Sequence, residues 1–251
     1  MESPTNWQGF ELPSLRGVAH IISGAPLDFV KVVAAILMVI DHVNYVFIAR
    51  DPNAIWYLGR PVYPLFAFAL ACNLLRGAAP WPYVQRLALV GLISQPIFSS
   101  LMPVNYANIL FTLAVGVCVI VALRPQSLLV QHLVFLVATL LMFSASLRVR
   151  GGLDYGLAGV LFPAALYLML EGRTSHGIWF AFMLFGLNWA EIDDPWSLRP
   201  LLVAFIAGAG GILIVLAAMT LKNRRRFLPR YALHVFYPGH LLVLLAIHRW
   251  F

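Results

Sequence analysis

The stretch ILMVIDHVNYVF, residues 36–47, places an aspartate and a histidine side by side in an otherwise apolar run. A charged side chain at bilayer depth costs roughly 2.5–3.5 kcal/mol on insertion scales, so it normally has a partner and a function. Asp41 supplies the charge, and His42 supplies a group that takes up and releases protons near neutral pH. The pair predicts proton-transfer chemistry, with His42 as the general base.

His42 belongs to a stripe of residues on one face of the predicted helix. The stripe comprises Asp28, Lys31, Ala35, Met38, His42 and Tyr45. Their spacings of 3, 4, 3, 4 and 3 are those of one helix face, and His42 lies about 16 Å beyond Lys31 at the helical rise. Asp41 points about 100° away from His42. We therefore predict an ion pair between Asp41 and Arg60 of the next helix, with His42 facing the bundle interior.

Other polar residues within or beside the apolar runs are expected to form two layers. The outer layer would collect Asp41, His42, Asn44, Arg60, Asn105, Asn108, Asp154, Tyr155, Asn188 and Trp189. The inner layer would hold Asp28, Lys31, Asn73, Arg76, Arg86, Arg124 and the basic loop at 222–230. Tyr237 and His240 fall at intermediate depth with His234 nearer the inside, and inward-facing histidines indicate proton transfer.

Structural interpretations of the same residues stand beside the chemical ones. The Asp41–Arg60 pair would serve equally as a structural ion pair that holds two helices together. Asn73, Asn108 and Asn188 would serve as interhelical hydrogen-bonding groups, worth about 0.6 kcal/mol each. The inner arginines would act as topology determinants next to anionic lipid.

The composition defines the environment in which these residues act. The chain has 251 residues, of which 61% are hydrophobic and 11% charged, and its mean hydropathy is +0.85. Soluble domains carry about 25% charged residues, so the composition indicates an integral membrane protein. The net charge of +7 is explained by basic loops beside membrane lipids, and no nucleic-acid partner is expected. Cys72 and Cys118 lie in apolar runs, so neither a disulfide nor a metal site is expected.

The apolar runs predict an all-α, polytopic bundle of about nine transmembrane spans, within a range of eight to ten. The runs are 27–49, 61–75, 87–102, 106–123, 127–147, 155–170, 177–189, 198–221 and 232–249. They form one domain over residues 27–251, preceded by a cytoplasmic tail at 1–26 with an interfacial segment at GVAHIISG and no removable signal peptide. Of the 17 Lys and Arg residues, ten fall inside and six outside when the amino terminus is cytoplasmic, and Lys31 lies within the first span.

Five sequence blocks resemble the TraX-type pilin acetylase family of conjugative plasmids. The first is LDFVKVVAAILMVIDH with YLGRPVYPLFAFALACNLLRG, followed by NILFTLAVGV, DYGLAGVLFPAALY, LNW and RFLPRYALHVFYPGHLLVLL. The opening LDxxK…H also looks like the first helix of the wider transmembrane acyltransferase group, in which arginine commonly stands at the position of Lys31. The block matches are Asp41, His42, Arg60, Pro64, Phe66, Asn108, Tyr155, Gly156, Asn188 and His240.

The resemblance implies acetyl transfer from acetyl-CoA to the amino-terminal residue of a processed pilin, in the bacterial inner membrane. His42 would then act as base or nucleophile, with Asp41 and Arg60 beside it, and His240 as a second proton-transfer group. Asn108 or Tyr155 would donate to the oxyanion. The phosphates of acetyl-CoA would be held by Lys31, Arg76, Arg86, Arg224 and Arg225. Asn44, Asn188 and Tyr237 would contact the acceptor, and no metal is expected.

Three other functions remain open. One is a different amide-forming step in pilin maturation, such as cyclisation. Another is a non-enzymatic assembly factor that binds pilin in the membrane. The third is a proton-coupled transporter, against which the sequence shows no inverted repeat. The serine elbow, HExxH, Walker and GxGxxG motifs are all missing from the sequence, which leaves hydrolase, metalloprotease and nucleotide-motor functions without support.

Overall fold

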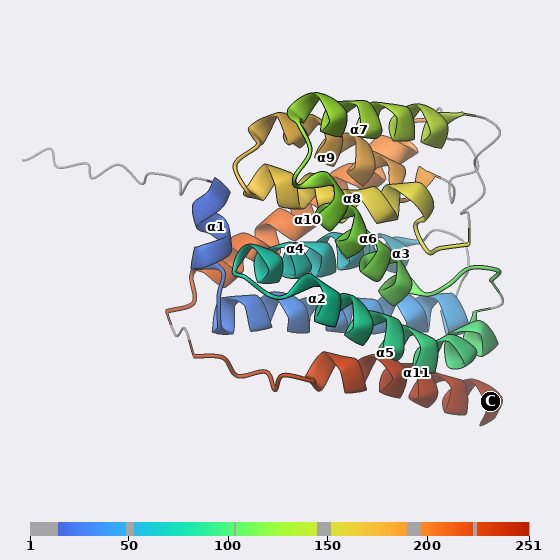
Figure 1. The fold of residues 1–251 in the computed structure, drawn as a ribbon. Coiled ribbons are helices and arrows are strands. Elements are labelled where there is room, and N and C mark those ends of the chain that lie inside the picture. The colour runs from blue at the N-terminus through green and yellow to red at the C-terminus, as the bar shows by residue number, and fades with distance from the viewer. Residues whose placement is uncertain are drawn as a thin grey trace, which may run out of the picture.

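The computed structural model describes residues 15–48, 53–102, 104–144, 152–189, 197–222 and 225–250. Figure 1 shows a bundle in which most helices run alongside one another, with the short α1 set across one end. The described helices are α1 (Leu15–Ile21), α2 (Ala25–Val43), α3 (Ala54–Gly59), α4 (Val62–Leu75), α5 (Pro80–Leu101), α6 (Ile109–Leu123), α7 (Leu128–Phe143), α8 (Gly156–Leu170), α9 (Gly177–Gly186), α10 (Arg199–Met219) and α11 (Ala232–Trp250). The π-helical turn η1 (Asn44–Ile48) extends α2. Over these residues the all-α prediction is confirmed.

Each of the nine apolar runs coincides with one described helix, namely α2 and α4 to α11. Three helical stretches are long and apolar enough to cross a membrane, judged by length and composition: Ala25–Ile48, Ala54–Leu75 and Arg199–Met219. Helices α6, α7 and α8 are apolar but shorter. The chain is therefore a helical membrane bundle, and a total of nine crossings stays a prediction.

Helices α4 and α8 form the centre of the bundle. Buried residues occupy almost every side of both helices, and 78% of the apolar window in Ala54–Leu75 is buried, against 17% of the window in α10. Phe205, Ile212 and Leu213 of α10 are exposed. A helix that is apolar all round is stable only inside a core or against hydrocarbon. The exposed face of α10 is thus a surface for lipid.

Several helices begin at a side chain that caps them. The side chains of Asn53, Asn108 and Ser127 accept hydrogen bonds from the N–H groups of Trp56, Leu110 and Val130. These caps fix the residue at which each of the three helices begins. They also place polar groups at the ends of the bundle.

One end of the bundle, here called the basic end, gathers Lys31, Arg76, Arg86 and the described residues 222 and 225–230. Asp28, only 1% exposed, accepts hydrogen bonds from the N–H groups of Phe227 and Leu228 at 3.0 Å. Its carboxylate also lies 3.5 Å from the ammonium of Lys31. The start of α2 is therefore fastened to the chain that leads into α11, as Figure 1 shows on the side of α1.

Candidate active site

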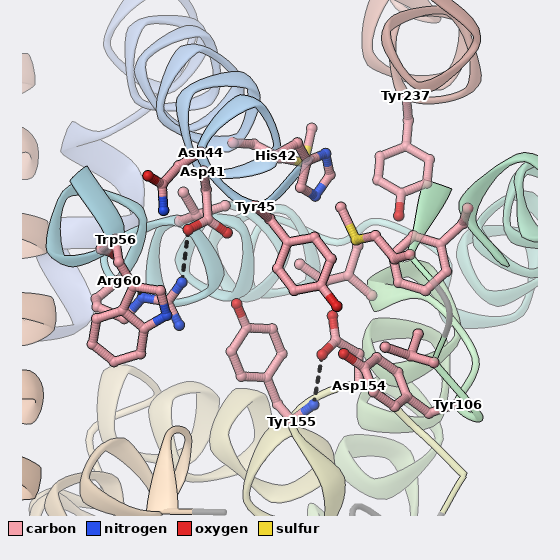
Figure 2. A pocket seen from close by; sticks show the side chains of 16 residues that line it. Asp41, His42, Asn44, Tyr45, Trp56, Arg60, Tyr106, Asp154, Tyr155 and Tyr237 are labelled. Atoms are coloured by element: carbon pink, nitrogen blue, oxygen red, sulfur yellow. Dashed lines mark hydrogen bonds and ion pairs between the residues drawn. The ribbon is translucent and has the colours of Figure 1, made fainter. Parts of the chain in front are cut away.

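The opposite end of the bundle holds a cavity of about 450 Å³. Side chains from α2, η1, α3, α5, α6, α11 and the turn before α8 line it (Figure 2). The polar lining residues are Asp41, His42, Asn44, Tyr45, Arg60, Tyr106, Asp154, Tyr155 and Tyr237. Met38, His42 and Tyr45 of the predicted stripe face this space together, and most of the predicted outer layer surrounds it.

Arg60 anchors one wall of the cavity. Its Nη2 lies 2.7 Å from Asp41 Oδ1, so the predicted ion pair is confirmed. Its Nε donates to the carbonyl of Trp56 at 3.0 Å, its Nη1 donates to Asn188 Oδ1 at 2.7 Å, and its guanidinium lies 4.1 Å from the centre of the Trp56 ring. Three partners hold the planar guanidinium in one orientation. Asp41 is fixed as a consequence.

The backbone at Gly59 allows α3 to approach Asp41 closely. A Cβ atom at this position would collide with the carboxylate of Asp41. Glycine is required because the neighbouring element leaves no room for a side chain. The short helix α3 therefore positions both Arg60 and the wall against which Asp41 rests.

His42 and His240 form a hydrogen-bonded pair between α2 and α11. His42 Nδ1 lies 2.9 Å from His240 Nε2, and the ring centroids are 5.1 Å apart with planes inclined by 10°. The separation of the ring centroids is close to the sum of the nitrogen–nitrogen distance and the radii of both rings, so the two nitrogens lie on the line between the centroids. The rings thus meet edge to edge and not face to face, which aligns the lone pair of one ring with the N–H of the other.

The partners of this pair determine where the protons sit. The carbonyl of Phe236 lies 3.0 Å from His240 Nδ1 and can only accept, so Nδ1 carries the hydrogen. In neutral His240, Nε2 is then an acceptor, which requires His42 to donate from Nδ1. His42 Nε2 is left with its lone pair. The Phe236–His240–His42 chain therefore presents His42 as a base, with the hydrogen positions inferred from the acceptors.

Asn108 is engaged in the fold and does not line the cavity. Its Oδ1 accepts from the N–H of Leu110, and its Nδ2 donates to the carbonyl of Gly91 and to Gln95 Oε1, both at 2.9 Å. An amide nitrogen has two hydrogens, and both are directed at these acceptors. The arrangement favours a structural role for Asn108 and leaves Tyr155 as the better placed of the two expected oxyanion donors.

The three residues expected to contact the acceptor lie in different surroundings. Tyr237 lines the cavity, and Asn44 lines it while accepting a hydrogen bond from Asn53 Nδ2 at 2.8 Å. Asn188, 2% exposed, lies behind Arg60 and holds its guanidinium. Tyr155 lines the cavity with its ring 4.6 Å from the ring of Tyr63.

The four described residues among those expected to hold acetyl-CoA lie away from the large cavity, at the basic end. Arg76 donates to the carbonyls of Ala19 and Ile22 and closes the end of α1. Arg86 lies over the ring of Tyr83. Arg225 is exposed, and Arg224 lies outside the described residues. Lys31 and Arg76 therefore already have intramolecular partners.

A second, narrow cavity of about 90 Å³ lies between these two regions of the bundle. Lys31, Tyr83 and His234 line it toward the basic end, and Met38 and Tyr237 line both this cavity and the larger one. Ile109 is likewise shared. These three shared side chains form a partition, a name kept for Met38, Ile109 and Tyr237 below. Its volume is about a fifth of that of the large cavity.

Sequence reasoning assigned no role to three groups at the site. Trp56 and Gln95 support Arg60 and Asn108 through contacts that become visible only once α3 and α5 are placed. Tyr106 also lines the cavity. Among the residues the structure describes, three or more His, Cys, Asp or Glu side chains do not gather as a metal site.

The bundle and its polar-lined cavity define a helical membrane protein with a candidate proton-transfer site. A family model described as TraX protein matches residues 26–248, and the chain belongs to this family. It is 30% identical over 228 residues to Protein TraX of Escherichia coli, covering 86% of this chain and 85% of that protein. It is 27% identical to Probable fimbrial assembly protein FimC, serogroup H1, of Dichelobacter nodosus, covering 85% and 92%. No solved structure matches the chain.

Proposed function

We propose that this chain is an integral membrane N-acetyltransferase that transfers acetyl from acetyl-CoA to the amino-terminal amine of a processed pilin. The observation that carries the proposal is the Phe236–His240–His42 hydrogen-bond chain, because it leaves an unprotonated ring nitrogen on His42, which lines a polar cavity. The name of the fimbrial assembly relative supports a role in building a pilus. TraX membership agrees with this role.

The proposed reaction begins with the removal of a proton from the acceptor. An α-amine has a pKa of about 8 in peptides and must be neutral to attack. His42 Nε2 takes one proton from the ammonium, and His240 stabilises the resulting imidazolium through its Nε2 lone pair. The amine nitrogen then forms a bond to the acetyl carbon as the carbon–sulfur bond breaks. The second amine proton ends on the departing thiolate sulfur.

Tyr155 is the proposed donor to the oxyanion that forms during this attack. Its side chain lines the cavity, and a positioned donor of this kind is typically worth about 3–4 kcal/mol. Asp41 and Arg60 would act by holding the wall beside His42. The lone pair on His42 Nε2 is also nucleophilic, so a transient acetyl-histidine would use the same geometry.

The donor and the acceptor would enter from opposite ends of the bundle. Arg86 and Arg225, with Lys31, Arg76 and Arg224, would hold the phosphates of acetyl-CoA at the basic end. The narrow cavity behind the partition would take the acyl-bearing arm. With the amino terminus in the cytoplasm of a bacterial inner membrane, the basic end faces the cytosolic donor, and the large cavity faces the side where a processed pilin terminus emerges.

The intact mass of co-expressed pilin tests the proposal. Wild type and His20→Ala, a control at an exposed histidine, should add one acetyl increment, whereas His42→Ala should add none. Full acetylation by His42→Ala would remove His42 from the mechanism. The loss of one water would indicate cyclisation, and an unchanged mass with stable co-purification would indicate an assembly factor; either outcome overturns the acetyl-transfer proposal.

A further inference from the structure

Tyr237 stands between the two cavities of the bundle. With Met38 and Ile109 it lines both the large cavity and the narrow one, and only 4% of the residue is exposed. Figure 2 shows its ring extending from α11 with the hydroxyl directed into the large cavity. In the proposed function, an acyl arm from the basic end would meet the acceptor at this place.

The hydroxyl of Tyr237 has no structural task that its neighbours reveal. Within the described part of the chain it makes no hydrogen bond, and the contact with His240, at 5.5 Å between centroids, is made by the ring. The other two side chains of the partition are apolar. A phenylalanine would fill the same space, and a buried polar group without a partner is destabilising. The hydroxyl therefore points to a ligand that enters the cavity.

The position of Tyr237 on α11 relates this hydroxyl to the proposed base. Tyr237 precedes His240 by three residues, so the two side chains lie on the same face of the helix. His240 Nε2 in turn lies 2.9 Å from His42 Nδ1. His42 and Tyr237 both line the large cavity. A proton acceptor and a hydrogen-bond donor are thus held against the same histidine.

Tyr155 approaches the large cavity from another element, the turn at residues 152–156. Among the described residues, it is the one non-glycine residue with positive φ, at 60°, and such a conformation persists only where the surroundings enforce it. A Cβ atom at Gly159 would lie 2.6 Å from Tyr155 Cβ, so α8 packs closely under the turn. Tyrosines from two separate elements therefore line one cavity, and acyl transfer needs fixed donors where negative charge develops.

We propose that Tyr237 donates a hydrogen bond to the acetyl carbonyl oxygen of the acyl donor and stabilises the negative charge that this oxygen acquires. The inference rests on the proposed function and assigns Tyr237 to the donor, where the sequence assigned it to the acceptor. As the amine nitrogen bonds to the acetyl carbon, one electron pair of the C=O bond moves to the oxygen, and Tyr237 keeps its proton while donating to it. The pair returns when the carbon–sulfur bond breaks and its electrons leave with the sulfur.

Two analogues of the acyl donor test this role without turnover. Trifluoroacetonyl-coenzyme A has a ketone that hydrates readily and then presents oxygens on a tetrahedral carbon, whereas S-ethyl-coenzyme A has no carbonyl oxygen. Both would be titrated against the purified full chain in nanodiscs. Tyr237→Phe should bind the first analogue about tenfold more weakly than wild type and the second with unchanged affinity. Unchanged affinity for the trifluoroketone, or an equal loss for both analogues, would overturn the role.

Kinetics adds a readout that a packing role would not move. In an acetyl-transfer assay with a free-amine peptide, Tyr237→Phe should lower kcat about 10²–10³-fold and change KM for either substrate less than about threefold. A ring-fluorinated tyrosine incorporated at position 237 keeps the hydroxyl and makes it a stronger donor, so kcat should stay at or above the wild-type value. Tyr231→Phe is the matched control, because Tyr231 is exposed and lines neither cavity.

Two kinetic results would contradict the inference. A higher KM for the peptide with unchanged kcat would show that Tyr237 contacts the acceptor instead. A fluorinated variant as slow as Tyr237→Phe would show that the acidity of the hydroxyl is irrelevant, and this variant also guards against misfolding of Tyr237→Phe.

The outcomes also separate this inference from the proposed function. An active wild type with normal kcat in Tyr237→Phe would overturn the inference alone. A wild type that leaves pilin unmodified would end the acetyltransferase proposal, and the analogue titrations would then decide the role of Tyr237. A wild type that binds neither analogue would overturn both.

Discussion

The carbonyl of Phe236 decides which nitrogen of His42 is basic, although it touches only His240. The sequence identified both histidines as proton-transfer candidates from their place in apolar runs. It could not show that they meet, because their side chains are 198 positions apart in the chain. The Asp41–Arg60 pair was predictable because the intervening connection is short. The two hydrogen bonds that the amide nitrogen of Asn108 donates could not be predicted, because their acceptors are Gln95 and Gly91 of α5.

At the scale of single residues, we predict that His240→Phe keeps a flat ring but loses the acceptor that orients His42. The rate constant kcat for acetyl transfer should fall between about 10² and 10⁴-fold, which is the usual contribution of positioned proton transfer. Steady-state kinetics with purified protein measures the effect. His248→Phe is the matched control, because His248 lies two turns further along α11 and is exposed. An unchanged kcat in His240→Phe would contradict the relay.

At the scale of elements, apolar runs located the helices because a buried or lipid-facing helix must be apolar over its whole length. The runs did not reveal α3 or the turn at 152–156. Helix α3 is only six residues long, too short for a periodic pattern. The turn depends on Ala107 and Thr112, which approach from α6 and the segment before it. Backbone conformations imposed by distant neighbours leave no local pattern in the sequence.

The close packing beneath this turn predicts the effect of Gly159→Ala. The added Cβ would lie 2.9 Å from Thr112 Cγ2 and closer still to Tyr155 Cβ. Overpacking of this kind typically costs about 1–3 kcal/mol, so the unfolding temperature in detergent should fall and acetyl transfer should weaken. In Gly211→Ala, where a Cβ meets nothing within 4 Å, the unfolding temperature should hold or rise. Equal behaviour of the two variants would argue against a packed turn.

At the scale of the whole molecule, the large cavity lies at the end of α2 that meets α3 and the basic end lies at its start, beside α1. Figure 1 shows α1 and α3 at opposite ends of the bundle. The charge distribution in the sequence predicted this separation, because basic loops tend to remain on the cytoplasmic side. Neither end could be assigned its cavities from the sequence, since these depend on how α2, α5 and α11 pack together. The sequence therefore predicts the orientation of the bundle, whereas the cavities can be located only in the folded structure.

Cysteine labelling tests the orientation of the bundle. In a background carrying Cys72→Ala and Cys118→Ala, a single cysteine would replace Leu198, 80% exposed at the cavity end, or Arg225, exposed at the basic end. A membrane-impermeant maleimide should label Leu198→Cys on intact spheroplasts, and Arg225→Cys only after lysis. The reverse pattern would place the basic end outside the cell and contradict a cytoplasmic donor site.

The partition of Met38, Ile109 and Tyr237 bears on the energetics of the host cell. Two water-accessible cavities joined end to end would conduct protons and dissipate the gradient that powers a bacterial membrane. Met38 and Tyr237 are each 4% exposed and Ile109 is 7% exposed, so the side chains between the cavities are tightly packed. Because Met38 and Ile109 are apolar, an ion that passed between them would have to lose its hydration water. A closed partition of this kind would limit the leakage of ions through the bundle.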